Sequence, residues 1–381
     1  MENITVVFCF NDRYCTLAAG AIASLIKNTT LKYSYDIYII HNDISDLNIF
    51  RLNKINNKQN VKIIFRRVNL KSYFTGDFFI WRDNFSKDTY TRLFLHKILP
   101  SIDKVLYLDG DLIITSDIAD LYNVDISHYS LAAAQDIDAM QGPEILLSRK
   151  ISNNLPEEIR KYENRWNYYT QYLGFSQKEI ENYFNAGVIL INLQRARKIL
   201  DRAYELLENI YLGQDQCILN ILFKNDKLIL DNRYNVGCGE VDKFVNDHGK
   251  LPDIIHYWAH SKPSNSMSSK WASEYWRAIR DTDFYYPALD SLVNNKLGAV
   301  KSNIKDQINQ VKDSLSNPCT LEDLYYNLRR THKVQRRRRY LRVIIKLLVD
   351  SKKYKKLKRD PGRFFGDSKS AFIRLLGRYY I

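Results

Sequence analysis

The first part of the chain alternates short apolar runs with stretches whose apolar side chains recur at helical spacing. The apolar runs are rich in Val, Ile and aromatic residues, and they cover residues 4–10, 35–40, 61–65 and 105–108. Helical spacing is found between them, over residues 14–27, 46–57 and 89–99. Runs this short predict buried strands, and strands that alternate with helices are typical of βαβ units. The pattern therefore predicts an α/β fold built on a mostly parallel sheet.

The pattern continues toward residue 275 and then changes. Residues 183–192 form a strongly apolar segment, and helical spacing follows over residues 193–212. Beyond residue 281 no strand pattern recurs, and residues 336–349 place apolar side chains on one face and Arg or Lys on another. That arrangement predicts a basic amphipathic helix. We expect three parts: an α/β domain at 1–275, a helical connecting region at 276–330 and a basic tail at 331–381.

The net charge of the chain is unevenly distributed. The whole sequence has 57 Lys+Arg and 43 Asp+Glu, a net charge of +14. Residues 301–381 hold 22 Lys+Arg and 7 Asp+Glu, which leaves 35 and 36 in residues 1–300. The α/β domain is therefore close to neutral, and the high net charge gives no reason to expect that domain to bind polyanions.

Three interpretations fit the basic tail. Attachment to an anionic membrane surface is the most economical, because aromatic residues follow the amphipathic helix at Phe364, Phe365, Phe372, Tyr379 and Tyr380. Each Lys or Arg near such a surface contributes about 1 kcal/mol of binding free energy. Nucleic-acid binding is the second interpretation, but no recognised nucleic-acid module accompanies the tail, so we expect no nucleic-acid partner. A solvated tail without a partner is the third.

Cysteine usage and hydropathy indicate a cellular compartment. The five Cys residues are scattered and form no C-x-x-C pair, which is typical of a chain kept in a reducing cytoplasm. No apolar run approaches the ~18 residues that a membrane-spanning helix needs, and the acidic Glu2 does not suit a secretory leader. We expect a cytoplasmic protein that is peripheral on the cytoplasmic face of the membrane.

Asp109, Gly110 and Asp111 are the most informative residues for chemistry, since they directly follow the apolar run at 105–108. Carboxylates at i and i+2 of an extended segment project to the same side and can hold one cation. Two enzyme classes use such a pair: phosphatases with an aspartyl nucleophile, and nucleotide-sugar glycosyltransferases. The phosphatase motif has Thr or Val where this chain has Ile113, and it lies on the first strand, so the glycosyltransferase interpretation is favoured.

Six ordered motifs then make residues 4–275 resemble glycosyltransferase family 8, the family of glycogenin and of lipopolysaccharide galactosyl- and glucosyltransferases. These motifs are residues 8–14, 90–93, 105–111, 183–192 and 214–216, and His256-Tyr257 with Lys262-Pro263. The resemblance implies a GT-A fold, which is a Rossmann-like, mostly parallel sheet with flanking helices, followed here by a helical, basic C-terminal extension.

The resemblance also implies roles for individual residues. Asp109, Asp111 and His256 match the metal ligands, and two carboxylates with one imidazole suit Mn²⁺, with Mg²⁺ as the alternative. Asp215, Gln216 and Asp136 match the residues nearest the reacting carbon, with Gln216 as a weak nucleophile or as a stabiliser of an oxocarbenium-like transition state. The residues matched to nucleotide-sugar binding are Asn11, Asp12, Tyr14, Arg92, Asp109, Gly110, Asn185, Ala186, Asp215, Gln216 and Lys262.

The resemblance implies a metal-dependent, retaining hexosyltransferase. The donor would be UDP-galactose or UDP-glucose, and the acceptor a glycan or glycolipid such as lipopolysaccharide core or another surface glycan, joined through an α-linkage. Without a suitably placed carboxylate pair, a retaining reaction favours attack from the same face over a covalent intermediate. The rival class is a basic nucleic-acid-binding protein on an inactive α/β scaffold, against which Asp109, Asp111, His256 and Lys262 argue.

Overall fold

The computed structural model describes residues 2–74, 76, 87–137, 156–162, 164–258, 262–264, 271–294 and 306. The chain divides into two compact units, Met1–Leu297 and Gly298–Ile381. All described residues except Asp306 lie in the first unit. The amphipathic helix expected at 336–349 and the basic tail at 331–381 lie outside the described residues. The boundaries at 275 and 330 remain predictions.

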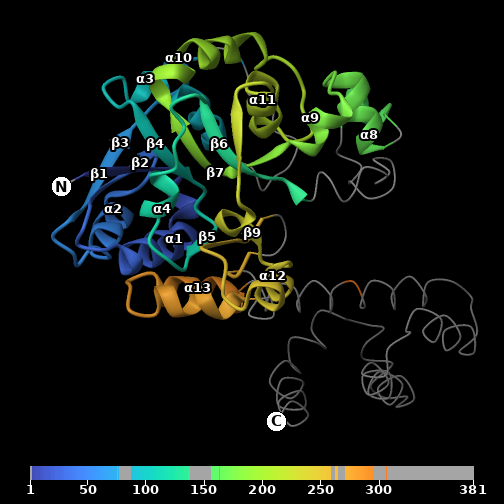
Figure 1. Cartoon of the computed structure of the whole chain (residues 1–381). Helices are drawn as coiled ribbons and strands as arrows, with labels where there is room; N and C mark the ends of the chain where they lie inside the picture. The colour runs from blue at the N-terminus through green and yellow to red at the C-terminus, as the bar shows by residue number, and fades with distance from the viewer. Residues whose placement is uncertain are drawn as a thin grey trace, which may run out of the picture. The chain divides into compact units, whose positions relative to one another are not determined.

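A seven-stranded sheet forms the centre of the first unit (Figure 1). Its strands are β1 (Asn3–Cys9), β2 (Ser34–His41), β3 (Val61–Arg67), β4 (Lys104–Leu108), β6 (Leu131–Gln135), β7 (Phe184–Asn192) and β8 (Lys227–Leu230). They lie in the order β3-β2-β1-β4-β7-β6-β8. Only β7 runs against its neighbours, because it pairs antiparallel with both β4 and β6 while the other pairings are parallel. The predicted α/β fold with a mostly parallel sheet is therefore confirmed.

Helices cover both faces of this sheet. Among the described residues, the α-helices are α1 (Cys15–Asn28), α2 (Asp46–Asn53), α3 (Leu95–Ile98), α4 (Ala119–Tyr122), α7 (Glu157–Arg160), α8 (Arg165–Asn167), α9 (Gln177–Glu181), α10 (Leu193–Asp201), α11 (Asp215–Leu222), α12 (Val241–His248) and α13 (Ala272–Ile279). Residues 285–294 are also helical. Among the described helices, none is long and apolar enough to cross a bilayer.

Two of the predicted helices differ from the structure. Residues 89–99 were expected to form one α-helix, but Lys87–Phe94 is a 3₁₀ helix and only Leu95–Ile98 is α-helical. Residues 90–94 are all buried, so the segment has no solvent face by which sequence could distinguish the two helix types. The helix expected at 193–212 ends at Asp201 and tightens into a 3₁₀ turn at Arg202–Glu205.

The alternating side chains of β1 enter two separate hydrophobic cores. Ile4, Val6 and Phe8 face one core, which also contains side chains from α1, α2 and α13. Val7 and Cys9 face the other core, which contains side chains from α3, α10 and α11. The first core also includes Phe284, Ala288 and Leu292. The chain thus belongs to this folded unit as far as residue 292.

A second, three-stranded sheet begins after a link of three residues that follows the carboxyl end of β4. It consists of β5 (Leu112–Ile114), β9 (Val236–Gly237) and β10 (Ile254–His256), in the order β5-β10-β9. The link between β4 and β5 is Asp109-Gly110-Asp111, which we call the D-G-D segment. The predicted motif therefore lies at the junction of the two sheets, at the carboxyl end of a parallel strand, where α/β sheets bind ligands.

Candidate active site

Backbone hydrogen bonds hold the link between the two sheets from both sides. The N–H of Asp109 donates to the carbonyl of Gly187 on β7, at 2.8 Å. The carbonyl of Asp111 accepts from the N–H of Tyr257, which follows β10, at 2.9 Å. The two aspartates are thus fixed against different sheets before their side chains make any contact.

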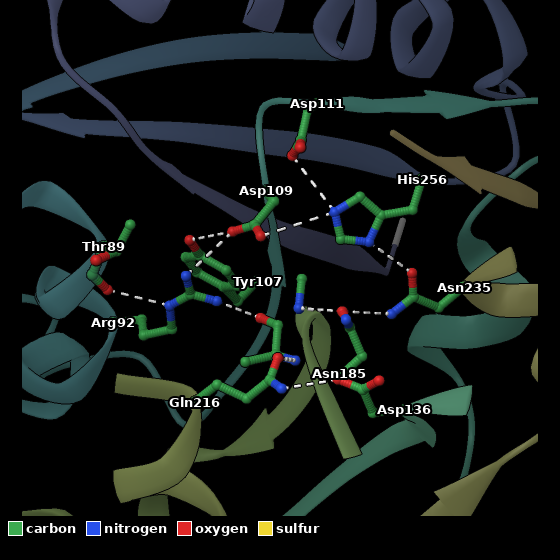
Figure 2. A network of polar contacts seen from close by, with 12 residues as sticks. Thr89, Arg92, Tyr107, Asp109, Asp111, Asp136, Asn185, Gln216, Asn235 and His256 are labelled. Atoms are coloured by element: carbon green, nitrogen blue, oxygen red, sulfur yellow. Dashed lines mark hydrogen bonds and ion pairs between the residues drawn. The ribbon is translucent and has the colours of Figure 1, made fainter. Parts of the chain in front are cut away.

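Strand register brings His256 to the two aspartates. Strand β10 pairs antiparallel with β5, which sets His256 opposite Leu112, the residue after Asp111. The Nε2 atom of His256 lies 3.4 Å from Asp111 Oδ1 and 3.9 Å from Asp109 Oδ2, as Figure 2 shows. One ligand atom from each of the three residues lies within 4.8 Å of the others.

The remaining carboxylate oxygens are already occupied by neighbouring side chains. Asp109 Oδ1 accepts a hydrogen bond from the Tyr107 hydroxyl at 2.7 Å and lies 3.3 Å from Arg92 Nη2. Asp111 Oδ2 pairs with the ammonium group of Lys262. One oxygen of each aspartate therefore remains to face His256 Nε2. Two carboxylate oxygens and one imidazole nitrogen that converge in this way fit a divalent cation such as Mn²⁺ or Mg²⁺.

Burial determines the protonation of two of these groups. Loss of solvent lowers the pKa of His256 to about 4, although Asp109 opposes the shift. The imidazole is thus neutral near pH 7, as a metal ligand must be. Burial also lowers the pKa of Lys262 to about 8, against the attraction of Asp109. Lys262 is therefore largely protonated near neutral pH, where it pairs with Asp111.

Arg92 joins two carboxylates beneath the site. Its side chain is 5% exposed, and its guanidinium lies 3.3 Å from Asp109 Oδ1 and 2.7 Å from Asp215 Oδ2. It also donates to the carbonyl oxygens of Thr89 and Ala186 and lies over the Tyr107 ring. These contacts make Arg92 a buried bridge between the D-G-D segment and α11, and its expected contact with the donor stays a prediction.

The first residues of α11 carry the next two predicted site residues. Burial raises the pKa of Asp215 to about 6, although the Arg92 guanidinium opposes this shift. Gln216 is held at both ends of its amide group, since Oε1 accepts from the N–H of Ala186 at 3.0 Å and Nε2 donates to Asp136 at 2.8 Å. The structure thus brings Asp136, Ala186, Asp215 and Gln216 together, as Figure 2 shows for Gln216 and Asp136.

A chain of amide groups connects Asn185 to His256. Asn185 Oδ1 accepts from the N–H of Gly187 at 2.9 Å and from Nδ2 of Asn235 at 3.0 Å. Asn235 Oδ1 lies 2.8 Å from His256 Nδ1. Figure 2 shows this line of contacts running from β7 to the imidazole.

Sequence reasoning missed three residues of this site. Asn235 and Tyr107 contact predicted ligands, but no spacing rule identifies them. Gly187 offered a signal, because glycine inside a buried strand often marks a close approach. A Cβ atom at Gly187 would lie only 2.2 Å from Cε1 of His256. This glycine therefore makes room for the imidazole.

Of the three predicted site residues in the segment after β1, Tyr14 packs against the D-G-D segment. A Cβ at Gly110 would lie 3.0 Å from the Tyr14 ring, so Tyr14 packs directly against this glycine. Asn11 instead caps the following 3₁₀ turn, and Asp12 Oδ1 accepts hydrogen bonds from Ser45 and Asn48 at the start of α2. The predicted roles of Asn11 and Asp12 at the nucleotide remain predictions.

Comparison with known sequences identifies the family of this unit. The sequence model of Glycosyl transferase family 8 matches residues 5–267. The glycosyltransferase GlyF of Streptococcus pneumoniae is 30% identical over 207 residues, 51% of this chain and 42% of GlyF. The lipopolysaccharide 1,2-glucosyltransferase of Escherichia coli is 25% identical over 286 residues, 71% of this chain and 74% of that protein. The chain thus spans less than half the length of GlyF.

A solved structure shares the fold. The galactosyltransferase LgtC, crystallised with donor and acceptor sugar analogues, superposes with a TM-score of 0.55 at 23% identity. The match covers 74% of this chain and 96% of LgtC. The first unit therefore has the GT-A fold that the motifs implied.

Proposed function

The chain belongs to glycosyltransferase family 8, and we propose that it is a metal-dependent, retaining hexosyltransferase. It would move galactose or glucose from a UDP-sugar to a glycan or glycolipid acceptor and form an α-linkage. The observation that carries the proposal is the convergence of Asp109 Oδ2, Asp111 Oδ1 and His256 Nε2 at the junction of the two sheets. The E. coli relative that transfers glucose to lipopolysaccharide supports a surface glycan as the acceptor.

A cation at these ligands, Mn²⁺ or Mg²⁺, would supply Lewis-acid chemistry by neutralising the charge that develops on the leaving nucleoside diphosphate. The protein adds its own positive charge through Lys262, whose ammonium group contacts Asp111. Lys262 is therefore the side chain we assign to the diphosphate.

Asn185, Asp215 and Gln216 are assigned to the donor sugar, and Asp136 to the region between donor and acceptor. Gln216 Oε1 accepts a hydrogen bond from the Ala186 N–H, which engages one of its two lone pairs and makes the oxygen a weaker nucleophile. This contact supports a stabilising role for Gln216 and attack of the acceptor from the face that the diphosphate leaves.

The test is UDP release from a panel of UDP-sugars, with Mn²⁺, with Mg²⁺ and with a chelator. We expect release with UDP-galactose or UDP-glucose, loss of release with the chelator, and a decrease of at least about 100-fold in Asp109→Asn. The matched control is Asp103→Asn, because Asp103 directly precedes β4, at the opposite end from Asp109, and its side chain is 74% exposed. Absence of UDP release with every sugar, or unchanged release in Asp109→Asn, would refute the proposal.

The basic tail at residues 331–381 is assigned to an anionic membrane surface. This attachment would keep the enzyme on the cytoplasmic face, next to a lipid-linked acceptor. The support is the clustering of basic and aromatic residues in the sequence of the tail.

A further inference from the structure

Asn235 contacts both the candidate metal ligand His256 and the candidate sugar ligand Asn185. It directly precedes β9 and is 3% exposed. Its two amide atoms have different partners: Nδ2 lies 3.0 Å from Asn185 Oδ1, and Oδ1 lies 2.8 Å from His256 Nδ1. This one side chain therefore links the candidate metal ligands to the candidate sugar-binding residues.

The backbone N–H of Gly187 determines the direction of the hydrogen bonds that link Asn185, Asn235 and His256. The N–H of Gly187 can only donate, so the Asn185 atom that it contacts must be the carbonyl oxygen. That oxygen can only accept, so Asn235 must present its NH₂ group to Asn185. The carbonyl oxygen of Asn235 then faces His256 Nδ1, which must carry the hydrogen. In the neutral ring, the lone pair is left on Nε2, the atom that faces Asp109 and Asp111.

We propose that Asn235 is a positioning residue that fixes the tautomer of His256 for metal binding and, at its other end, orients Asn185 toward the donor sugar. This inference rests on the function proposed above. A hydrogen-bond acceptor on the far nitrogen of a histidine ligand holds the ring and raises its basicity. Because Asn185 Oδ1 is occupied twice, only its NH₂ group remains without a partner among the described residues.

The Asn235→Asp variant separates the two roles. A carboxylate still accepts the hydrogen of His256 Nδ1, so Mn²⁺ affinity should remain within about threefold of the wild type. The same carboxylate presents an oxygen to Asn185 Oδ1, where a donor is needed. Asn185 should therefore lose its orientation, and kcat/KM for the UDP-sugar should decrease at least tenfold at saturating Mn²⁺.

The Asn235→Ala variant removes both contacts. Mn²⁺ affinity, measured on the protein without sugar from the electron paramagnetic resonance of free Mn²⁺, should decrease about 10–100-fold. The matched control is Asn56→Ala, since Asn56 is a half-buried amide that donates to the carbonyl of Val61 at the start of β3. Thermal unfolding of each variant checks that the fold is retained. Wild-type Mn²⁺ affinity in a folded Asn235→Ala would overturn the inference.

The tautomer itself is measurable without any substitution at Asn235. In the metal-free wild type, ¹⁵N spectra of the imidazole should show hydrogen on Nδ1 and none on Nε2, with His256→Gln used to assign the signals. Hydrogen on Nε2 would overturn the inference even if every Asn235 variant failed to fold. If the wild type bound no Mn²⁺, the proposed function would fail. Wild-type Mn²⁺ binding that Asn235→Ala leaves unchanged would instead contradict the positioning role alone.

Discussion

At the scale of single residues, Gly187 is a position where the site has no room for a side chain. It lies on β7 between Asn185 and the pairing with β4, and its carbonyl anchors Asp109. A Cβ atom there would lie 2.2 Å from His256 Cε1 and 3.0 Å from Asp109 Oδ2. Both atoms belong to predicted metal ligands, so any adjustment must move a ligand.

We expect Gly187→Ala to weaken Mn²⁺ binding at least tenfold and to cost about 1–3 kcal/mol of folding free energy through overpacking. The measurements are Mn²⁺ titration and urea denaturation. Gly239→Ala is the control, because a Cβ at Gly239 would have no heavy atom within 4 Å. Equal Mn²⁺ affinity in the two variants would show that the glycine is not needed for ligand placement.

We expect Asp215 to make the proposed activity depend on pH. Burial raises its pKa to about 6, so its carboxylate is present above pH 6 and is lost as the pH falls through this value. Protonation removes the ion pair with Arg92, so kcat/KM should rise with pH and reach half of its plateau near pH 6. In Asp215→Asn, the residual kcat/KM should no longer decrease as the pH falls through 6. A limb centred near pH 4 in the wild type would contradict this assignment.

At the scale of elements, the position of α11 against β7 depends on Asn220. This residue is 1% exposed, and its side chain makes both hydrogen bonds to the backbone of Phe184, each at 2.9 Å. Its amide also donates to the carbonyl of Gln216 at 3.0 Å. The helix that carries Asp215 and Gln216 is thereby fixed to the strand that carries Asn185.

We expect Asn220→Ala to destabilise the protein by about 2–4 kcal/mol, because two buried backbone groups of Phe184 lose their partner. Activity should also decrease in the protein that remains folded, since the spacing of Gln216 and Ala186 depends on this contact. Chemical denaturation and steady-state kinetics are the measurements. The exposed Asn209, substituted by Ala, should change stability by less than about 0.5 kcal/mol. Similar losses in both variants would argue against a specific link.

The central strands could be predicted from sequence because burial on both faces leaves continuous apolar runs. Residues 4–10, 35–40 and 61–65 were correctly placed to within two residues at either end. The helix type of Lys87–Phe94 could not be predicted, because residues 90–94 are all buried and so lack the periodicity that distinguishes a 3₁₀ helix from an α-helix.

Site residues next to a recognisable sequence pattern could be predicted, whereas those placed by contacts between distant strands could not. Asp109 and Asp111 could be inferred from their place after an apolar run, whereas His256 required a resemblance to a known family. Asn235 was missed because its contacts arise from the pairing of β10 with β5 and β9 and from the position of β7. None of these pairings leaves a spacing rule in the sequence.

At the scale of the whole molecule, the excess of basic residues lies in a stretch of sequence that contains none of the proposed site residues. Residues 331–381 contain 17 Lys+Arg and 3 Asp+Glu, so the rest of the chain has no net formal charge. Truncation at residue 330 therefore changes the electrostatics of the protein without removing any proposed site residue.

We expect the full chain to sediment with vesicles that contain anionic lipid and the truncated chain to stay in the supernatant. Binding should weaken as salt rises, because surface charge is screened within about 10 Å at 0.1 M salt. UDP release from a UDP-sugar in solution should be retained by the truncated chain. Vesicles of neutral lipid serve as the control. Equal sedimentation of both chains would refute the membrane role, and sedimentation with neutral lipid would refute its electrostatic basis.

The junction of the two sheets also has a consequence for how the protein reaches its native state. Asp109 and His256 are separated by 147 positions in the chain, yet they face one another across a single pairing of β5 with β10. Contacts between such distant segments form late, because closing a long loop costs entropy before any contact compensates for it. A partly folded chain that contains the parallel strands β1 to β4 would have the two aspartates without the histidine. If the three residues bind a metal as proposed, full metal affinity would be acquired only when folding of the unit is complete.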